Sequence, residues 1–257
     1  MPLLARFKND DLLEIGVDET GRGPFFGPLM AGAVLLPPEA EWTEDQRRVF
    51  LQLRDSKKIA PKKRERLAEE LRACLVGGCA VGSVSAEEIN QRGIQWANRE
   101  AFRRAVEGLG LGAEAGEVGG EKVRLILDGT IRMEEWKGEQ ELVVEGDGKY
   151  MAVAGASILA KVDHDRWIQA CTQEHPEWEE RYDLVRSKGY GTARHRQGIR
   201  LYGGCEQHRE VFIQRWLPGA GLAPPRAERR LGRKTTTCLI QFGPPKVEKE
   251  NNGADTQ

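Results

Sequence analysis

Three acidic residues stand where strand-like apolar runs end. Asp18 and Glu19 follow the run at residues 12–17, and Asp128 closes a second run at residues 123–127. Sites of α/β folds lie at the carboxyl edge of the sheet, so strands that end there bring their acids together. Converging carboxylates repel one another unless they share a cation, and Mg²⁺ and Mn²⁺ prefer oxygen-only ligands. These acids are therefore candidate metal ligands. For any single one, a helix cap or a turn-forming role is the alternative.

A glycine-rich turn, GRGPFFGP at residues 21–28, follows the first two acids. Such turns present backbone N–H groups to a phosphate or a sugar. The glycine spacing also resembles a dinucleotide fingerprint, but acids precede it and Pro24 interrupts the expected helix start. A nicotinamide-dependent oxidoreductase is disfavoured further, because no acidic ribose-binding residue ends a second strand in a suitable βαβ unit.

The elements that would position these residues alternate between strands and helices. Apolar runs predict strands at 12–17, 29–36, 81–84, 122–128 and 141–146. Helices are expected from Pro61, from a capping box at 85–88, over 149–171 and, as a short last helix, over 212–217. Residues 108–120 contain six glycines and predict a loop. The alternation indicates an α/β fold.

Composition places the chain among globular proteins. It has 257 residues, 39 Lys+Arg against 40 Asp+Glu, and 39% hydrophobic residues. A chain of this size buries roughly 70% of its unfolded surface without disulfides or structural metal. The longest apolar runs fall far short of the roughly 20 residues that cross a bilayer, and acids interrupt the N-terminal segment where a secretory signal needs an apolar core. Five cysteines without a CxxC pair indicate reduced thiols and a cytoplasmic location. Secreted, membrane, collagen-like and zinc-ribbon classes are thereby excluded.

Basic residues are clustered although the net charge is only −1. Residues 54–66 hold seven basic side chains against two acids, and residues 186–209 hold six against one. Local basic patches on a neutral chain fit a polyanionic partner at one face. A solvated helix face is the alternative for either patch taken alone.

Five segments in this order resemble ribonuclease HII, the prokaryotic type 2 ribonuclease H: IGVDETGRGPFFGP, DSKKIAPKKRERL, ILDG, AVAGASILAKVDHDR and SKGYGTARH. The resemblance covers residues 13–212. It implies a ribonuclease H-like mixed β-sheet flanked by helices, with a C-terminal helical region, in one catalytic domain over residues 1–217. Residues 218–257 are expected to form a disordered tail. The implied reaction is hydrolysis on the 5′ side of ribonucleotides, in RNA–DNA hybrids or embedded in duplex DNA, leaving a 3′-hydroxyl and a 5′-phosphate.

The resemblance also implies four catalytic carboxylates, which would hold two Mg²⁺ or Mn²⁺ ions: Asp18, Glu19, Asp128 and Asp165. Asp165 comes from the resemblance alone, as the acid directly before Arg166. Asp163 lies on a different helical face and is not the match. Two ions explain four acids, because one lowers the pKa of the attacking water and the other stabilises the leaving 3′-oxygen.

Substrate contacts follow from the same motifs. The turn matches a family motif whose backbone reads the 2′-hydroxyl, the group that separates RNA from DNA. Tyr190 matches the tyrosine that packs on the sugar at the RNA–DNA junction, and the DSKK segment matches residues that contact phosphates. The implied substrate-binding residues are Gly21, Arg22, Gly23, Ser56, Lys57, Lys58, Tyr190 and Thr192, with Arg194 and His195 as further candidate phosphate neighbours.

Some positions depart from the family pattern. Glu145 stands where a basic residue is usual, which puts a phosphate contact there in doubt, and His164 replaces a common arginine. The turn at 25–28 resembles ribonuclease HIII, which carries an extra N-terminal domain. Only 14 residues precede Ile15, so ribonuclease HII is favoured. An HIII-like hybrid nuclease and a catalytically silent hybrid-binding module are the alternatives.

Two weaker patterns complete the sequence. His175, Cys205 and His208 have no standard zinc spacing, so surface or packing roles are favoured. Residues 236–242, TTCLIQF, distantly resemble peptides that dock on replication sliding clamps. The expected partners are thus RNA–DNA hybrid and ribonucleotide-containing duplex, with a clamp at the tail, no membrane and a monomeric chain.

Overall fold

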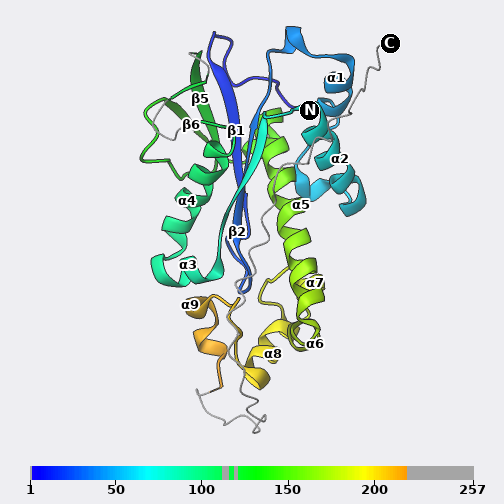
Figure 1. Ribbon diagram of the computed structural model, residues 1–257, viewed down its shortest axis with the longest axis vertical. Coiled ribbons are helices and arrows are strands. Elements are labelled where there is room, and N and C mark those ends of the chain that lie inside the picture. The colour runs from blue at the N-terminus through cyan, green and yellow to red at the C-terminus, as the bar shows by residue number, and fades with distance from the viewer. Residues whose placement is uncertain (1, 112–115, 119–120, 219–257) are drawn as a thin grey trace, which may run out of the picture. The chain divides into compact units, whose positions relative to one another are not determined.

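A computed structural model describes residues 2–111, 116–118 and 121–218 of the protein (Figure 1). Its centre is a six-stranded sheet in which the strand order is β3-β2-β1-β5-β4, with β6 paired to β5. The strands are β1 (Leu13–Thr20), β2 (Leu29–Leu35), β3 (Cys79–Val84), β4 (Glu117–Val118), β5 (Glu121–Asp128) and β6 (Glu139–Val143). The sheet is mixed, because β1 runs antiparallel to β2 and parallel to β5. The predicted α/β class is confirmed.

Strand β1 occupies the middle of the sheet and sets the position of the acids. It pairs in parallel with β5, with Val17 beside Leu127, so the next residues, Asp18 and Asp128, reach the same edge. The strand continues through Thr20. Asp18 therefore lies inside the end of the strand rather than after it, because its backbone still pairs with β2.

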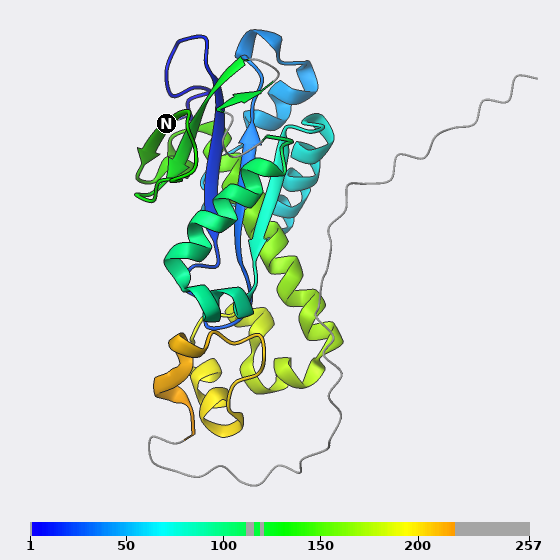
Figure 2. The same cartoon turned by 60° about the vertical axis from the view of Figure 1, so that its left-hand side comes forward.

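Helices cover both faces of the sheet (Figures 1 and 2). One face packs on α4 (Ile94–Glu107), preceded by α3 (Ala86–Arg92), and the other packs on α5 (Met151–Glu174) with α2 (Pro61–Cys74) and α1 (Glu44–Phe50). The predicted capping box at Ser85 is present, as is Pro61 at the first turn of α2. Each face has its own apolar cluster of buried side chains, which is why both layers of helices are needed.

Helix α5 lies unusually close to β1. A Cβ atom added at Gly16 would meet the Ala152 carbonyl carbon at 2.2 Å and the Val153 nitrogen at 2.3 Å. Only a glycine allows the helix backbone to approach the strand to this distance. The close contact brings Ser157, further along α5, to the acids at the end of β1.

The end of α5 leads into a helical region near the carboxyl end of β1 (Figure 2). It consists of α6 (Pro176–Tyr182), α7 (Leu184–Ser187), α8 (Ala193–Tyr202), α9 (Glu210–Ile213) and the 3-10 turn η4 (Gln214–Trp216). The expected C-terminal helical region is thus present, with the short last helix divided between α9 and η4. Helices α6 and α8 pack on each other, and α7 contacts α5.

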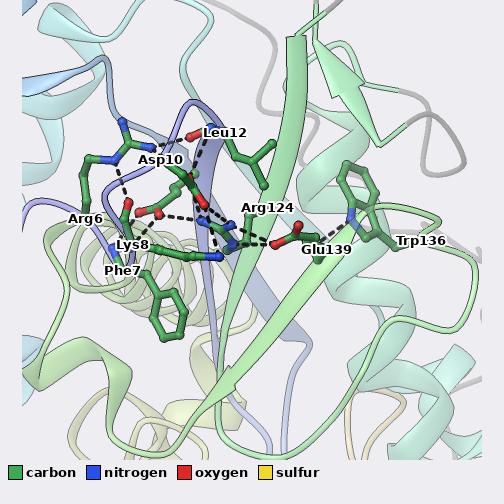
Figure 3. Close-up of polar contacts among 9 residues, drawn as sticks. Arg6, Phe7, Lys8, Asp10, Leu12, Arg124, Trp136 and Glu139 are labelled. Carbon is green, nitrogen blue, oxygen red and sulfur yellow. Dashed lines mark hydrogen bonds and ion pairs between the residues drawn. The ribbon is translucent and has the colours of Figure 1, made fainter.

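A buried arginine holds the opposite end of the sheet together (Figure 3). The Arg124 side chain is fully buried on β5 and pairs with Asp10 at 2.6 Å, with Glu139 on β6 at 2.8 Å and with Glu14 on β1 at 3.1 Å. The Asp10 pKa is held at about 2, chiefly by its hydrogen bond from Arg124. The network joins the N-terminal segment to three neighbouring elements and lies away from the acids at the other edge.

The segment at 108–120 is not entirely loop, because Glu117–Val118 pairs with the start of β5 as strand β4. The predicted tail, apart from Pro218, lies outside the described residues, and so does the clamp-like segment at 236–242. No helix in the described part of the chain combines the length and apolar character that crossing a bilayer requires.

Candidate active site

Asp18 and Asp128 form the centre of the site at the edge of β1 and β5. Asp18 is buried, with 5% of its surface exposed, and its Oδ1 accepts a hydrogen bond from the Glu19 backbone N–H at 2.7 Å. Asp128 Oδ1 accepts from the Gly146 backbone N–H at 2.6 Å. Backbone groups therefore fix both carboxylates at the edge that the sequence predicted.

The environment of Asp18 disfavours its charge. Burial raises the pKa of Asp18 well above its ordinary value of 3.8, and the neighbouring charges of Asp128 and Glu19 act in the same direction. A hydrogen bond with Ser157 on α5 acts in the opposite direction but does not reverse the shift in pKa. A desolvated carboxylate beside other carboxylates is the arrangement that a bound cation stabilises.

Glu19 extends the acidic group toward α4. Burial and the charge of Asp128 raise the pKa of Glu19 from 4.5, against a smaller effect of Arg22, whose Nη1 lies 4.0 Å from Glu19 Oε1. The fully buried Asn98 on α4 lies beside Glu19 and acts to lower its pKa. Neither amide atom of Asn98 has a hydrogen-bond partner at standard geometry in the described structure. A polar group this deeply buried and unpartnered is unusual, and it faces the acidic group.

Asp147 joins this group although sequence reasoning did not select it. It lies in the 3-10 turn η3 (Gly146–Gly148) between β6 and α5 and is buried. Burial and the charges of Asp128 and Asp55 raise its pKa, as burial does for Asp18 and Glu19. Its position directly after Gly146, at a strand-to-helix junction, is the signal that could have identified it. Glu145, two residues before Asp147, stands where a basic residue is usual in the family, and it is exposed with a φ of 57°.

Lys57 places a positive charge near the acids. Although partial burial acts to lower it, the pKa of Lys57 is raised on balance by Asp147, Asp18 and other nearby carboxylates. Lys57 sits in the short turn η2 (Ser56–Lys58), which Asp55 caps by accepting from the Lys57 N–H at 2.9 Å. The buried Ser56 hydroxyl lies 2.9 Å from the Ser157 hydroxyl. Ser56 therefore ties this basic loop to α5 beside Asp18, and Lys57 and Lys58 remain exposed.

Asp165 has a different environment from the other three predicted acids. Lys161 Nζ lies 2.5 Å from its Oδ1, and Arg64 Nη2 lies 3.6 Å from its Oδ2. Although burial acts in the opposite direction, His164 and Lys161 lower the pKa of Asp165 to about 2. Asp165 is thus stabilised as an anion by cations of the chain, whereas Asp18 is not. Its neighbour Asp163 pairs with Arg72 of α2 at 2.7 Å, on another face of α5.

The glycine turn lies directly beyond these acids. Gly21 has a φ of +83°, and a Cβ atom there would lie 2.9 Å from Cδ2 of the buried His164, so α5 packs directly against the turn. Gly23 faces the ring of Tyr190, whose Cε1 would lie 3.4 Å from a Cβ at that position. The Tyr190 side chain is 47% exposed. The structure therefore brings the predicted turn and the predicted tyrosine together.

Predictions for the remaining polar residues have mixed outcomes. Thr192 caps α8 through its hydroxyl, which accepts from the His195 N–H at 3.2 Å, and its side chain is exposed. The expected phosphate contact at His195 is wrong, because this side chain is fully buried. His175 stacks on Trp178. No three His, Cys, Asp or Glu side chains of the described residues meet as a group that could hold a metal.

The donors nevertheless suit a hard divalent cation. Asp18, Glu19, Asp128 and Asp147 offer only oxygen. Burial penalises the charges of Asp18, Glu19 and Asp147 in the absence of a cation. The unpartnered amide of Asn98 offers a hydrogen-bonding site for the hydration shell of such an ion. Since the described carboxylates do not form a ready ligand group, binding requires side-chain adjustment around the ion.

Comparison with known proteins supports one family. The sequence model of ribonuclease HII matches residues 15–216. A ribonuclease HII from Delftia acidovorans is 38% identical over 221 residues, which cover 85% of this chain and 84% of that protein.

Solved structures share the fold. The ribonuclease H2 of Pyrococcus horikoshii covers 80% of this chain and 99% of its own, with a TM-score of 0.59 and 24% identity. The ribonuclease HII of Archaeoglobus fulgidus, solved in complex with PCNA, covers 81% of this chain and 91% of its own, with a TM-score of 0.54 and 23% identity. The expected ribonuclease H-like fold is confirmed. On the match of its sequence from residue 15 to residue 216, the chain belongs to the ribonuclease HII family of RNA–DNA hybrid endoribonucleases.

Proposed function

We propose that this hydrolase cuts the phosphodiester on the 5′ side of ribonucleotides, both in RNA–DNA hybrids and where single ribonucleotides are embedded in duplex DNA, and so serves ribonucleotide removal. The products are a 3′-hydroxyl and a 5′-phosphate. One observation carries the proposal: the acids at the end of β1 run directly into the turn on which Tyr190 packs. A group that reads ribose thus adjoins a group that can hold a metal.

The chemistry divides among named residues. Asp18, Glu19, Asp128 and Asp165 are the proposed ligands of two divalent ions, Mg²⁺ or Mn²⁺. When bound, the ions supply a water of lowered pKa and charge neutralisation at the leaving 3′-oxygen. Ser157 orients Asp18 by hydrogen bonding, and the backbone N–H of Gly146 orients Asp128.

Substrate recognition uses the rim of the site. Backbone groups of Gly21, Arg22 and Gly23 read the 2′-hydroxyl, and Tyr190 packs on the adjacent sugar. Lys57, whose charge lies near the acids, and the adjacent Lys58 are both exposed and contact backbone phosphates without sequence preference. Thr192, exposed at the start of α8, is a further phosphate neighbour.

The test compares labelled duplex DNA containing one ribonucleotide with a long RNA–DNA hybrid, each with Mg²⁺, Mn²⁺ or EDTA. The wild type is expected to cut both substrates with either metal and neither in EDTA. Asp18→Asn should lose cleavage, whereas the matched control Asp163→Asn, a buried acid on α5 paired with Arg72, should retain it. Cleavage of long hybrids only would favour the HIII-like specificity. Substrate binding without cleavage in any metal would favour the silent binding module.

A partner and a location remain as proposals. We infer that the segment at 236–242 docks on a replication sliding clamp, supported by the PCNA complex of the Archaeoglobus fulgidus relative. Deleting residues 234–257 should then weaken clamp binding with cleavage retained, and unchanged binding would refute the assignment. The cytoplasmic location and the monomeric state stay predictions from the sequence.

A further inference from the structure

Three segments far apart in the chain are joined beneath the proposed ribose-reading surface. The Phe25 N–H of the glycine turn donates to the Gly189 carbonyl at 2.8 Å, next to Tyr190. The turn also bonds to the segment before α9: Arg209 N–H donates to the Phe25 carbonyl at 2.8 Å. Gly27 N–H donates to the Gln207 carbonyl at 2.9 Å. The segment at 205–209 therefore contacts the glycine turn, and the glycine turn contacts the loop that carries Tyr190.

Two buried histidines continue this connection through their side chains. The Cys205 backbone N–H donates to His208 Nδ1 at 2.9 Å, so that nitrogen carries no proton. The proton of the neutral His208 ring is then on Nε2, which lies 2.9 Å from His195 Nε2 and donates to it. His195 must accordingly hold its proton on Nδ1, which lies 3.0 Å from the Tyr190 carbonyl oxygen. The chain of hydrogen bonds runs in one direction, from Cys205 to the backbone of Tyr190.

Burial keeps both rings in this neutral state. It lowers the pKa of His208 to about 3, with the neighbouring His195 acting in the same direction. It also lowers the pKa of His195. At neutral pH each ring therefore has one donor and one acceptor, which the chain of hydrogen bonds requires.

Arg209 connects the same segment to both ends of the glycine turn. Its fully buried guanidinium donates to the Gly27 carbonyl through Nε at 3.0 Å and Nη2 at 2.9 Å. Nη1 donates to the Arg22 carbonyl at 3.2 Å. Among the described residues no carboxylate pairs with this cation, and burial lowers the Arg209 pKa to about 9. Its contacts are thus with the two ends of the turn rather than with a counter-ion.

We propose that His195, His208 and Arg209 are positioning residues that fix Tyr190 against the glycine turn, and so set how accurately the enzyme recognises the ribose at the junction. This inference rests on the proposed function of Tyr190 and the turn as the ribose reader. The histidines act through the Tyr190 backbone and Arg209 through the turn carbonyls. All three are buried, so they act without touching substrate.

A double-mutant cycle tests action through Tyr190. The variants are His195→Leu, Tyr190→Ala and the combination, assayed on duplex DNA with one ribonucleotide. His195→Leu is expected to lower kcat/KM about tenfold, chiefly through KM, since one buried hydrogen bond is lost. In the Tyr190→Ala background the same change should cost less than about twofold, because residues in one network are not additive. Equal losses in both backgrounds would overturn the proposal, since they would indicate general destabilisation.

Rescue provides the matched control. In His195→Asn the amide nitrogen can take the place of Nδ1 and donate to the Tyr190 carbonyl, so this variant should recover most of the lost kcat/KM. His195→Asn behaving as His195→Leu would also overturn the proposal.

A measurement on the unmodified protein covers the case in which variants fail to fold. The ring-nitrogen NMR signals of the four histidines, assigned by single substitution, should show His208 protonated on Nε2 and His195 on Nδ1 at pH 7. Either ring in the other tautomer, or charged, would refute the hydrogen-bond chain. Wild-type protein that does not cut the ribonucleotide duplex would refute the proposed function instead, so the two failures are distinguishable.

Discussion

Replacing either of two acids of the proposed site by its neutral amide should change the stability of the metal-free protein, in opposite directions for the two acids. Burial and neighbouring carboxylates raise the pKa of Asp18, so its charge opposes folding. Lys161 and Arg64 surround Asp165, whose pKa is lowered to about 2, so its charge supports folding. Asp18→Asn should therefore stabilise the protein in EDTA, and Asp165→Asn should destabilise it.

The magnitudes follow from the same environments. Lowering a carboxyl pKa from 3.8 to about 2 corresponds to about 2 kcal/mol that Asp165→Asn forfeits. Asp18→Asn removes a buried charge whose desolvation opposes folding, so this variant should be more stable than the wild type. For a domain of this size each kcal/mol moves Tm by roughly 2–4 °C. Asp165→Asn should therefore lower Tm by about 4–8 °C, and Asp18→Asn should raise it.

The pH dependence has the corresponding signs. Because the folded pKa of Asp18 exceeds its unfolded value, metal-free wild type loses stability as pH rises above about 3.8 toward the folded pKa, and Asp18→Asn removes this loss. Asp165 contributes stability that is fully present above its unfolded pKa and is lost as pH falls through about 2.

Thermal unfolding in EDTA, followed by circular dichroism, is the assay. Adding Mg²⁺ at ten times its Kd should raise wild-type stability by about 1.4 kcal/mol, and Asp18→Asn should gain less. Asp18→Asn that is less stable than wild type in EDTA, or that gains as much from Mg²⁺, would refute the reasoning about the acidic group.

Other predictions concern packing, the buried network and phosphate contacts. In chemical denaturation, Gly16→Ala should lower the free energy of unfolding by at least about 3 kcal/mol, because the added Cβ would lie 2.2 Å from the α5 backbone. The control Gly155→Ala on α5 should be neutral or stabilising, because no neighbour lies closer than 3.4 Å to the added Cβ. Arg124→Met should lower Tm with cleavage by the folded protein retained, because it leaves the buried Glu14 carboxylate without its arginine partner far from the site, and an unchanged Tm would contradict this. Lys57→Gln should raise KM and reduce the slope of log K against log salt by about 1 in filter binding, and an unchanged slope would argue against a phosphate contact.

The sequence allowed the centre of the site to be predicted because local pattern defines it. Asp18 and Asp128 each follow an apolar run, and parallel pairing of β1 with β5 carries them to one edge. Asp147 was missed because it follows a short strand and a glycine, a pattern that a turn equally explains. Its burial depends on α5 packing, which no local pattern expresses.

The buried residues that contact the glycine turn and the loop of Tyr190 could not be predicted for a related reason. Arg209 bonds to the Gly27 carbonyl across 182 positions of the chain, and His208 was noticed only as an unsuitable zinc ligand. Such contacts depend on how the helical region folds back on the glycine turn. Asp165 could be selected only through the family resemblance, since Asp163 is an equally acidic residue of the same helix. Tertiary packing distinguishes the two, because Asp163 pairs with Arg72 of α2 and Asp165 pairs with Lys161.

The most direct test of the central claim maps where and how the strand is cut. Duplex DNA with one ribonucleotide, labelled at the 5′ end, is incubated with wild type and Mg²⁺, and the product is compared with synthetic markers. One product is expected, which ends on the deoxynucleotide before the ribonucleotide, carries an extendable 3′-hydroxyl and is absent with Asp18→Asn. A cut on the 3′ side of the ribonucleotide, a cyclic phosphate end, or unchanged cleavage by Asp18→Asn would refute the proposed function.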